Sequence, residues 1–128
     1  MASSKALTDL QLRIMDVLWR RGQATVAEVR QALRPGRDLA RNTVGTILSR
    51  MEKQGFVGHR EELNSFVFYP LVSQQRVQDE AMKQMVDSLF GGSRTELVGR
   101  LLGVDKISNE QLDRIESLLR DYAARRKE

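Results

Sequence analysis

The fold is decided by residues 41–53, which read RNTVGTILSRMEK. Four apolar residues recur there at the i, i+3, i+4, i+7 spacing that places them on one face of an α-helix: Val44, Ile47, Leu48 and Met51. The opposite face carries the small or polar residues Asn42, Gly45, Thr46 and Ser49, flanked by Arg41, Thr43, Arg50 and Lys53. We therefore expect a helix that turns its apolar face to a core and its slim polar face to another molecule.

The polar face of this helix has the chemistry that the major groove of DNA requires. Asn pairs with adenine through two hydrogen bonds, the Thr methyl group contacts the thymine methyl group, and Arg reads guanine or holds a phosphate. Gly45 costs the helix about 1 kcal/mol relative to Ala, but its small size lets another surface approach the backbone closely. The alternative is a polar face that is simply hydrated. We favour DNA, and the predicted DNA-binding residues are Arg41, Asn42, Thr43, Thr46, Ser49 and Arg50.

The segments around this helix have the outline of a winged helix-turn-helix. Thr8 with Gln11, and Thr25 with Glu28, have the spacing of capping boxes, and each opens a run of apolar residues at helical spacing. Beyond Gly55, residues 56–60 and 66–69 are predicted strands, joined by a turn over residues 62–65 in which Asn64 can adopt a positive φ. The predicted order is three helices followed by a β-hairpin, the wing.

Four residues of this wing are candidates for contact with the sugar-phosphate backbone or the minor groove: His59, Arg60, Asn64 and Ser65. Arg60 is the strongest candidate, because its guanidinium can bind a phosphate. His59 is the only histidine, so it cannot build a metal site by itself, and the absence of cysteine excludes disulfides and thiolate metal sites. We expect no metal and no cofactor.

Residues 73–128 are predicted to form three further amphipathic helices: a long one over residues 73–90, a short one from Ser93 and a last one capped by Ser108. So short a segment cannot bury all of its apolar residues alone, and pairing with a second copy of the chain is the economical solution. Folding back onto the N-terminal half is the alternative. The predicted dimerisation residues are Met85, Leu89, Phe90, Leu97, Leu101, Ile115, Leu118 and Leu119.

The charge follows the same division into a DNA-binding domain, residues 1–72, and a helical dimerisation region, residues 73–128. The first part carries 11 Lys/Arg against 7 Asp/Glu, and the second carries 10 of each, so the basic excess lies in the first part. A local excess of this kind is typical of a surface that faces a polyanion, although a hydrated charged face would give the same count.

The composition excludes other classes of protein. No apolar run approaches the ~20 residues of a membrane span, and residues 1–6 lack the apolar centre of a signal peptide, so we expect a cytoplasmic protein without a membrane partner. Catalysis is not expected, because there is no glycine-rich phosphate loop and no nucleophile elbow. Glu61 and Glu62 are adjacent on a strand and point to opposite faces, so they cannot act on one substrate atom.

The chain resembles the BlaI/MecI/CopY family of penicillinase repressors over nearly its whole length. The resemblance is carried by residues 7–8, 14–19, 24–26, 28–29, 42–44, 46–48, 55–57, 69–73 and 89–93. It implies a homodimer that is held by the C-terminal helices and represses transcription from palindromic operator DNA. It also implies that Arg41, Asn42, Thr43 and Thr46 meet base edges, and that Arg50 and the wing lie near phosphates.

Three departures from the family limit what the resemblance implies. The C-terminal cysteines with which CopY-like members sense copper are absent. Penicillinase repressors are inactivated by cleavage of an Asn-Phe bond, where this chain has Gly99-Arg100-Leu101, so an inactivating protease stays an open question. At the wing turn many relatives carry Gly-Arg, where this chain has Leu63-Asn64. Since winged helices also serve as docking domains, a protein-interaction module without specific DNA binding is the alternative function.

Overall fold

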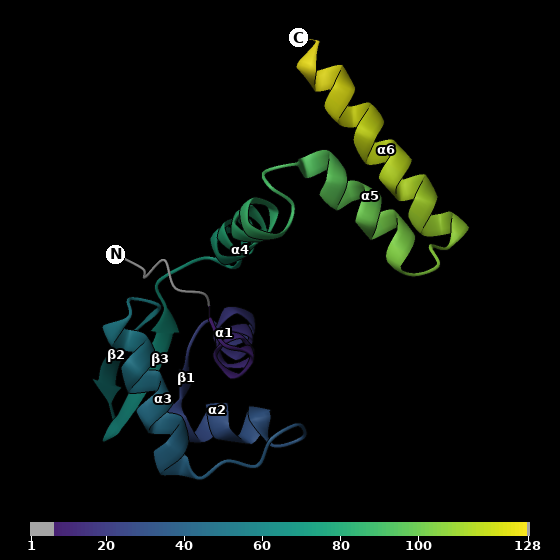
Figure 1. The fold of residues 1–128 in the computed structure, drawn as a ribbon. Coiled ribbons are helices and arrows are strands. Elements are labelled where there is room, and N and C mark those ends of the chain that lie inside the picture. Colours follow the sequence, from purple (N-terminus) through teal and green to yellow (C-terminus); the bar gives the residue numbers. More distant parts are fainter. Residues whose placement is uncertain (1–6, 128) are drawn as a thin grey trace. The chain divides into compact units, whose positions relative to one another are not determined.

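The computed structural model of the chain describes residues 7–127 (Figure 1). The elements follow in the order α1 (Asp9–Arg21), β1 (Ala24–Thr25), α2 (Val26–Leu33), α3 (Arg41–Lys53), β2 (Val57–Glu62), β3 (Ser65–Pro70), α4 (Gln74–Leu89), α5 (Arg94–Val104) and α6 (Asn109–Arg126). The mainly α-helical winged helix-turn-helix with a C-terminal helical region is confirmed. The expectation that the N-terminus is no signal peptide concerns residues 1–6, which lie outside the described residues.

The chain forms two compact units, one ending at Met82 and the other beginning at Lys83. Helix α4 contributes residues to both, and we describe each unit by itself. This division concerns packing alone, so the assignment of DNA binding to residues 1–72 and of dimerisation to residues 73–128 stays a prediction.

The sheet of the first unit has three antiparallel strands in the order β1-β3-β2. In the hairpin, His59 is opposite Phe68, Arg60 is opposite Val67, and Glu61 is opposite Phe66. Strand β1 adds Ala24 and Thr25 to the outer edge of β3, and it was not predicted because two residues are too few to show a period of two. It places the start of α2 beside the wing.

Helices α1, α2 and α3 share one core with the base of the hairpin. Ile14, Met15 and Leu18 of α1, Val29 of α2, and Val44, Leu48 and Met51 of α3 are fully buried, and they meet Phe56, Val57 and Phe68. Ile47 was expected in this group but is only partly buried, because it lies at the edge of the stripe. The buried stripe therefore fixes the rotation of α3 about its own axis.

Local interactions set where the helices begin. Thr8 and Thr25 both form the expected capping boxes: the Thr25 hydroxyl accepts from the backbone N–H of Glu28 at 3.1 Å, and the Glu28 carboxylate accepts from that of Thr25 at 2.9 Å. This backbone hydrogen bond is the main cause that lowers the pKa of Glu28 below its ordinary value of 4.5, since it favours the ionised carboxylate. Helix α3, by contrast, is preceded by Ala40 as its N-cap residue, whose side chain has no oxygen that could cap the helix.

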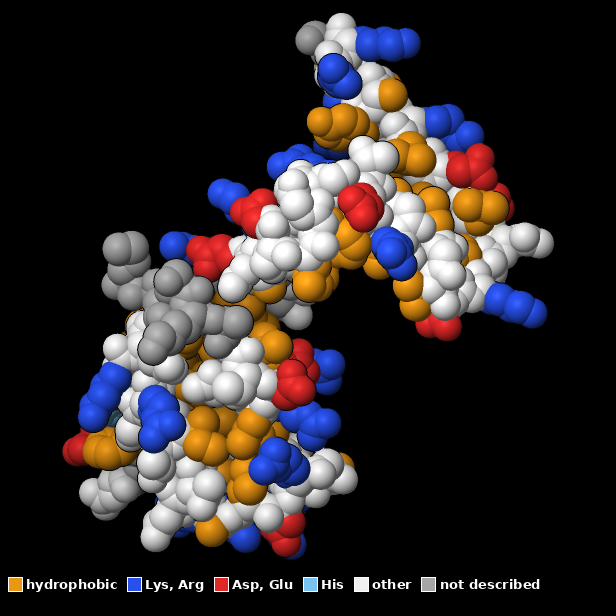
Figure 2. Space-filling model, viewed as in Figure 1, with side chains coloured by type: hydrophobic (Ala, Val, Ile, Leu, Met, Phe, Trp, Pro, Cys, Tyr) orange, Lys and Arg blue, Asp and Glu red, His pale blue; other side chains and the backbone are white. Residues whose placement is uncertain are grey.

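The second unit buries little of its apolar surface. Among the described residues from Lys83 onward, only Val86 and Leu97 count as buried hydrophobic residues. Leu89, Leu101, Leu118, Leu119 and Tyr122 are all more than 60% exposed, and Figure 2 shows hydrophobic side chains spread over α5 and α6. Within residues 7–127, no helix is both long and apolar enough to cross a membrane.

The two faces of α3 predict very different losses of stability on truncation at neighbouring positions. Leu48→Ala should lower the free energy of unfolding by about 2–5 kcal/mol, because it leaves a cavity at a fully buried site. Ser49→Ala, one residue further and exposed, should change it by less than about 0.5 kcal/mol. Urea denaturation followed by the fluorescence of Trp19, the only tryptophan, measures both, since its indole N–H donates to the Val72 carbonyl at 2.9 Å and loses this partner on unfolding. Equal losses would contradict the assignment of the faces.

Candidate DNA interface

A groove of about 740 Å³ lies between the polar face of α3, the start of α2 and the wing. Its walls come from three segments that are distant in the sequence. They are Thr25, Val26 and Ala27; Arg41, Asn42, Gly45, Thr46 and Ser49; and Glu61, Asn64, Ser65, Phe66 and Phe68. The structure thus brings together four of the six predicted residues of α3 with two of the four predicted residues of the wing. Thr43 and Arg50 are exposed on α3 outside this lining, and His59 and Arg60 are also outside it.

The cations of α3 have no acidic partner among the described residues. Within residues 7–127, the side chains of Arg41, Arg50 and Lys53 form no ion pair, and all three are exposed. Beside α3, the guanidinium groups of Arg30 in α2 and of Arg34 at its C-terminal end lie 4.0 and 3.7 Å from the carboxylate of Asp38, in the loop before α3. Positive charge is therefore available to a ligand on α3 and partly neutralised beside it.

The middle of the polar face is slim. Apart from the backbone of α3 itself and the two neighbouring residues, a Cβ atom added at Gly45 would meet no heavy atom of the described chain within 4 Å, so the fold does not require glycine there. At the next residue, the Thr46 hydroxyl donates to the carbonyl of Asn42, one turn earlier, at 2.9 Å. Because this hydrogen bond uses the hydroxyl proton, Thr46 offers its methyl group and an oxygen lone pair to the groove.

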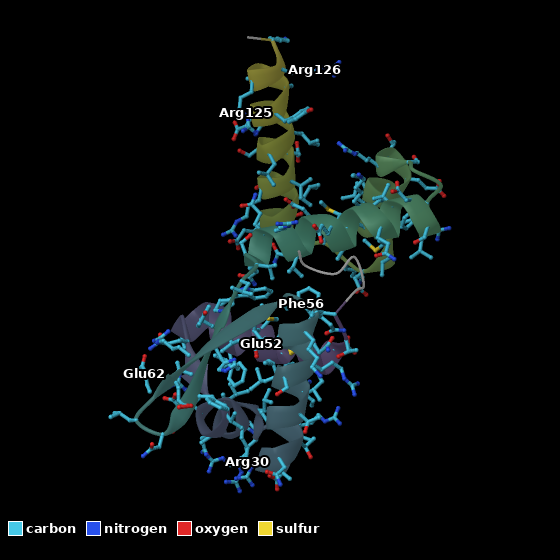
Figure 3. All side chains as sticks on the ribbon, turned by 90° about the vertical axis from the view of Figure 1, so that its left-hand side faces the viewer. Arg30, Glu52, Phe56, Glu62, Arg125 and Arg126 are labelled. Carbon is cyan, nitrogen blue, oxygen red and sulfur yellow. The ribbon has the colours of Figure 1, made fainter. Side chains whose placement is uncertain are left out.

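The start of α3 is held by Arg30 of α2. The Arg30 Nε–H donates to the Leu39 carbonyl at 2.7 Å, and Figure 3 shows Arg30 below the end of α3 at which that helix begins. The hydrogen bond fixes the backbone directly before Ala40. Arg30 is thus a structural residue, which positions the N-terminal residues of α3 relative to the groove.

His59 joins the wing to α3. Its Nδ1 lies 2.7 and 2.8 Å from the two carboxylate oxygens of Glu52, and its ring lies 4.8 and 5.4 Å from the rings of Phe66 and Phe68. Figure 3 shows Glu52 on the side of α3 that faces the hairpin. This placement gives His59 a role in holding the wing against α3, and contact between His59 and DNA stays a prediction.

Arg60 points to the other face of the hairpin. Its guanidinium contacts the Glu62 carboxylate and the Gln23 side chain, and it lies 5.9 Å from the centre of the Tyr69 ring. Glu62 lies near the tip of the wing in Figure 3. Arg60 is therefore already neutralised in the free protein, and the predicted phosphate contact would require it to leave Glu62.

The sequence analysis did not assign Glu61, Phe66 and Phe68 to the interface, although all three line the groove. The alternation of side chains along a strand could have predicted this placement. Val57 is buried against α3, so residues 59 and 61 share its face, as do their partners Phe68 and Phe66. The expectation that Glu61 and Glu62 point to opposite faces agrees with this register.

Among the described residues, no group of three or more His, Asp or Glu side chains could hold a metal ion.

Comparison with known proteins matches the chain to a protein family. Residues 7–121 match the penicillinase repressor family. The penicillinase repressor of Bacillus licheniformis is 24% identical over 122 residues, which are 95% of each chain. The transcriptional regulator BlaI of Mycobacterium tuberculosis is 30% identical over 129 residues, which cover 97% of this chain and 90% of that protein.

A solved structure is similar to part of the chain. The DNA-binding domain of the repressor BlaI, determined in solution, superposes with a TM-score of 0.51 at 27% identity, covering 58% of this chain and 90% of that one.

Proposed function

The chain belongs to the penicillinase repressor family, and we propose on this premise that it is a transcriptional repressor that reads operator DNA with α3. The observation that carries the proposal is the groove beside α3, where Arg41, Asn42, Gly45 and Thr46 meet the wing. An α-helix is about 10–12 Å across and the major groove is about 12 Å wide, so α3 fits it with its polar face toward the bases. We propose the cytoplasm as its compartment.

The proposed roles follow from position and charge. Asn42 and Thr46 project from the N-terminal half of α3 into the groove and read base edges, Asn42 through its amide and Thr46 through its methyl group. Within residues 7–127, Arg41 and Arg50 have no acidic partner, and they bind guanine or phosphate. Thr43 and Ser49 supply hydrogen bonds at the edge of the same face.

The second unit supports a homodimer. Except for Leu97, the leucines of α5 and α6 are exposed, and a second copy of the same surface would cover them. Of the predicted dimerisation residues, Leu97 is buried within the chain and Phe90 and Ile115 are half-buried, so Met85, Leu89, Leu101, Leu118 and Leu119 are the ones available to a partner. A two-fold dimer would read a palindrome with two copies of α3.

Two variants of α3 separate base reading from phosphate binding. Asn42→Ala should weaken binding to the preferred duplex by about 1–3 kcal/mol and relax the preference at particular base pairs. Arg50→Ala should weaken binding to all duplexes alike and reduce the slope of log K against log salt by about one for each phosphate that it no longer neutralises. Gel shifts on a duplex selected from a random pool measure both effects, and Arg114→Ala, which removes a cation from α6, is the control. Binding that barely responds to salt, with both variants unchanged, would favour the docking module.

Gly45→Ala should stabilise the free protein and weaken its binding to DNA. Alanine fits without a clash and favours the helix, so the free energy of unfolding should rise by up to about 1 kcal/mol. The added methyl group lies at the centre of the reading face and should weaken duplex binding at least several-fold. Gly99→Ala, inside α5 and equally free of neighbours, is the matched control and should leave duplex affinity unchanged. Equal duplex affinity for the Gly45 variant and the parent would show that close approach at this position is not needed.

Leu119→Asp should separate the subunits, because it places a charge in the middle of the exposed apolar face of α6. Sedimentation should show a dimer for the parent and a monomer for the variant, and affinity for a two-site operator should fall more than affinity for a half-site. Ser117→Asp adds the same charge on the opposite side of α6 and should stay dimeric. A monomeric parent would end the dimer proposal.

A further inference from the structure

The tip of the wing combines two features that do not favour folding. Leu63 and Asn64 join β2 to β3, and both have positive φ, 47° and 64°. Two-residue hairpin loops of this kind favour Asn or Gly at both positions, because a Cβ atom clashes with the backbone in the left-handed region. Asn64 suits its position. Leu63 does not, and the sequence analysis expected a positive φ for Asn64 alone.

Leu63 is also 97% exposed, so its side chain has almost no contact with the rest of the chain. A leucine that is neither buried nor compatible with its backbone conformation contributes nothing to the core. Asparagine or glycine at this position would form the same turn at a lower cost. Residues that are held in an unfavoured conformation and do not serve the fold are candidates for contact with another molecule.

The remaining charges of the wing exclude an electrostatic role for its tip. Residues 57–70 contain one arginine and two glutamates, and Arg60 is bound to Glu62 and Gln23 on the outer face. Glu61 faces the groove, where it would repel a phosphate. The chemistry that the tip offers to a partner is therefore the apolar side chain of Leu63 and the neutral amide of Asn64.

The position of the wing tip indicates which part of a DNA duplex it would contact. Asn64, Ser65 and Phe66 line the same groove as Arg41 and Asn42, so the tip lies beside the N-terminal half of α3. If α3 lies in the major groove, a wing tip beside its N-terminal half would reach across the flanking sugar-phosphate strand to the adjacent minor groove. Apolar side chains such as leucine are used by proteins to contact sugars and base steps in the minor groove.

We propose that Leu63 is a specificity-determining residue, which packs against sugars and base edges in the minor groove next to the site read by α3. This inference rests on the proposed function. The Asn64 amide can donate to the acceptors that A·T pairs present there, whereas the N2 amino group of guanine occupies the space that a leucine needs. The tip therefore selects flanking base pairs without that amino group.

The test uses a duplex selected by the parent protein, with the flanking base pairs changed to A·T, G·C or I·C. Inosine keeps the major-groove pattern of guanine and lacks its N2 amino group, so a difference between G·C and I·C arises in the minor groove. The parent should bind the A·T and I·C duplexes alike and the G·C duplex several-fold more weakly. Leu63→Asn should bind the A·T duplex about tenfold more weakly than the parent and lose this discrimination. Its salt slope should not change, because no charge is altered.

The stability of the same variants completes the test. Leu63→Asn should raise Tm by a few degrees, because asparagine tolerates the positive φ, so weaker DNA binding could not be attributed to unfolding. Leu63→Met keeps an apolar side chain and should retain affinity within about twofold. If Leu63→Asn binds all three duplexes as the parent does while Asn42→Ala weakens binding, the inference about Leu63 is overturned and the proposed function stands. If the parent selects no duplex, both are overturned.

Discussion

The burial of one stripe of α3 is the constraint on which the rest of the structure depends. Val44, Leu48 and Met51 are fully buried against α1, α2 and the hairpin, and full burial of such a side chain stabilises the fold by about 1.5–3 kcal/mol. A rotation of α3 that exposed them would cost several times that amount. The opposite stripe, with Asn42, Thr46 and Ser49, is therefore held outward whatever its own contacts are.

Several features around this face are unfavourable for the free protein but suit binding. Helix α3 begins without a side-chain cap at Ala40, Gly45 lowers helix propensity in open space, and Leu63 is exposed with a positive φ. The other end of α3 is well fixed, because Glu52 pairs with His59. Such local departures from what folding favours, gathered on one surface, are expected where a protein meets its ligand.

The periodic features of the fold could be predicted from the sequence, and the long-range pairings could not. Helical spacing predicted both faces of α3, and the Thr8 and Thr25 capping boxes marked where two helices begin. The contact of Arg60 with Gln23 joins residues 37 positions apart, and nothing in the local pattern indicates it. Strand β1 was too short to predict. The face of Glu61 followed from the register of β2, and the conformation of Leu63 was missed because leucine rarely adopts a positive φ.

The most direct test of the central claim is thiol labelling of single cysteines, because the natural chain contains none. Cysteine at position 49, on the exposed face of α3, should react rapidly in the free protein and much more slowly when a selected duplex is bound. Cysteine at position 48 should be unreactive in both states, and cysteine at position 117 should react at the same rate with and without DNA. Equal labelling rates at position 49 in the presence and absence of a bound duplex would contradict the claim that α3 is the DNA-reading helix.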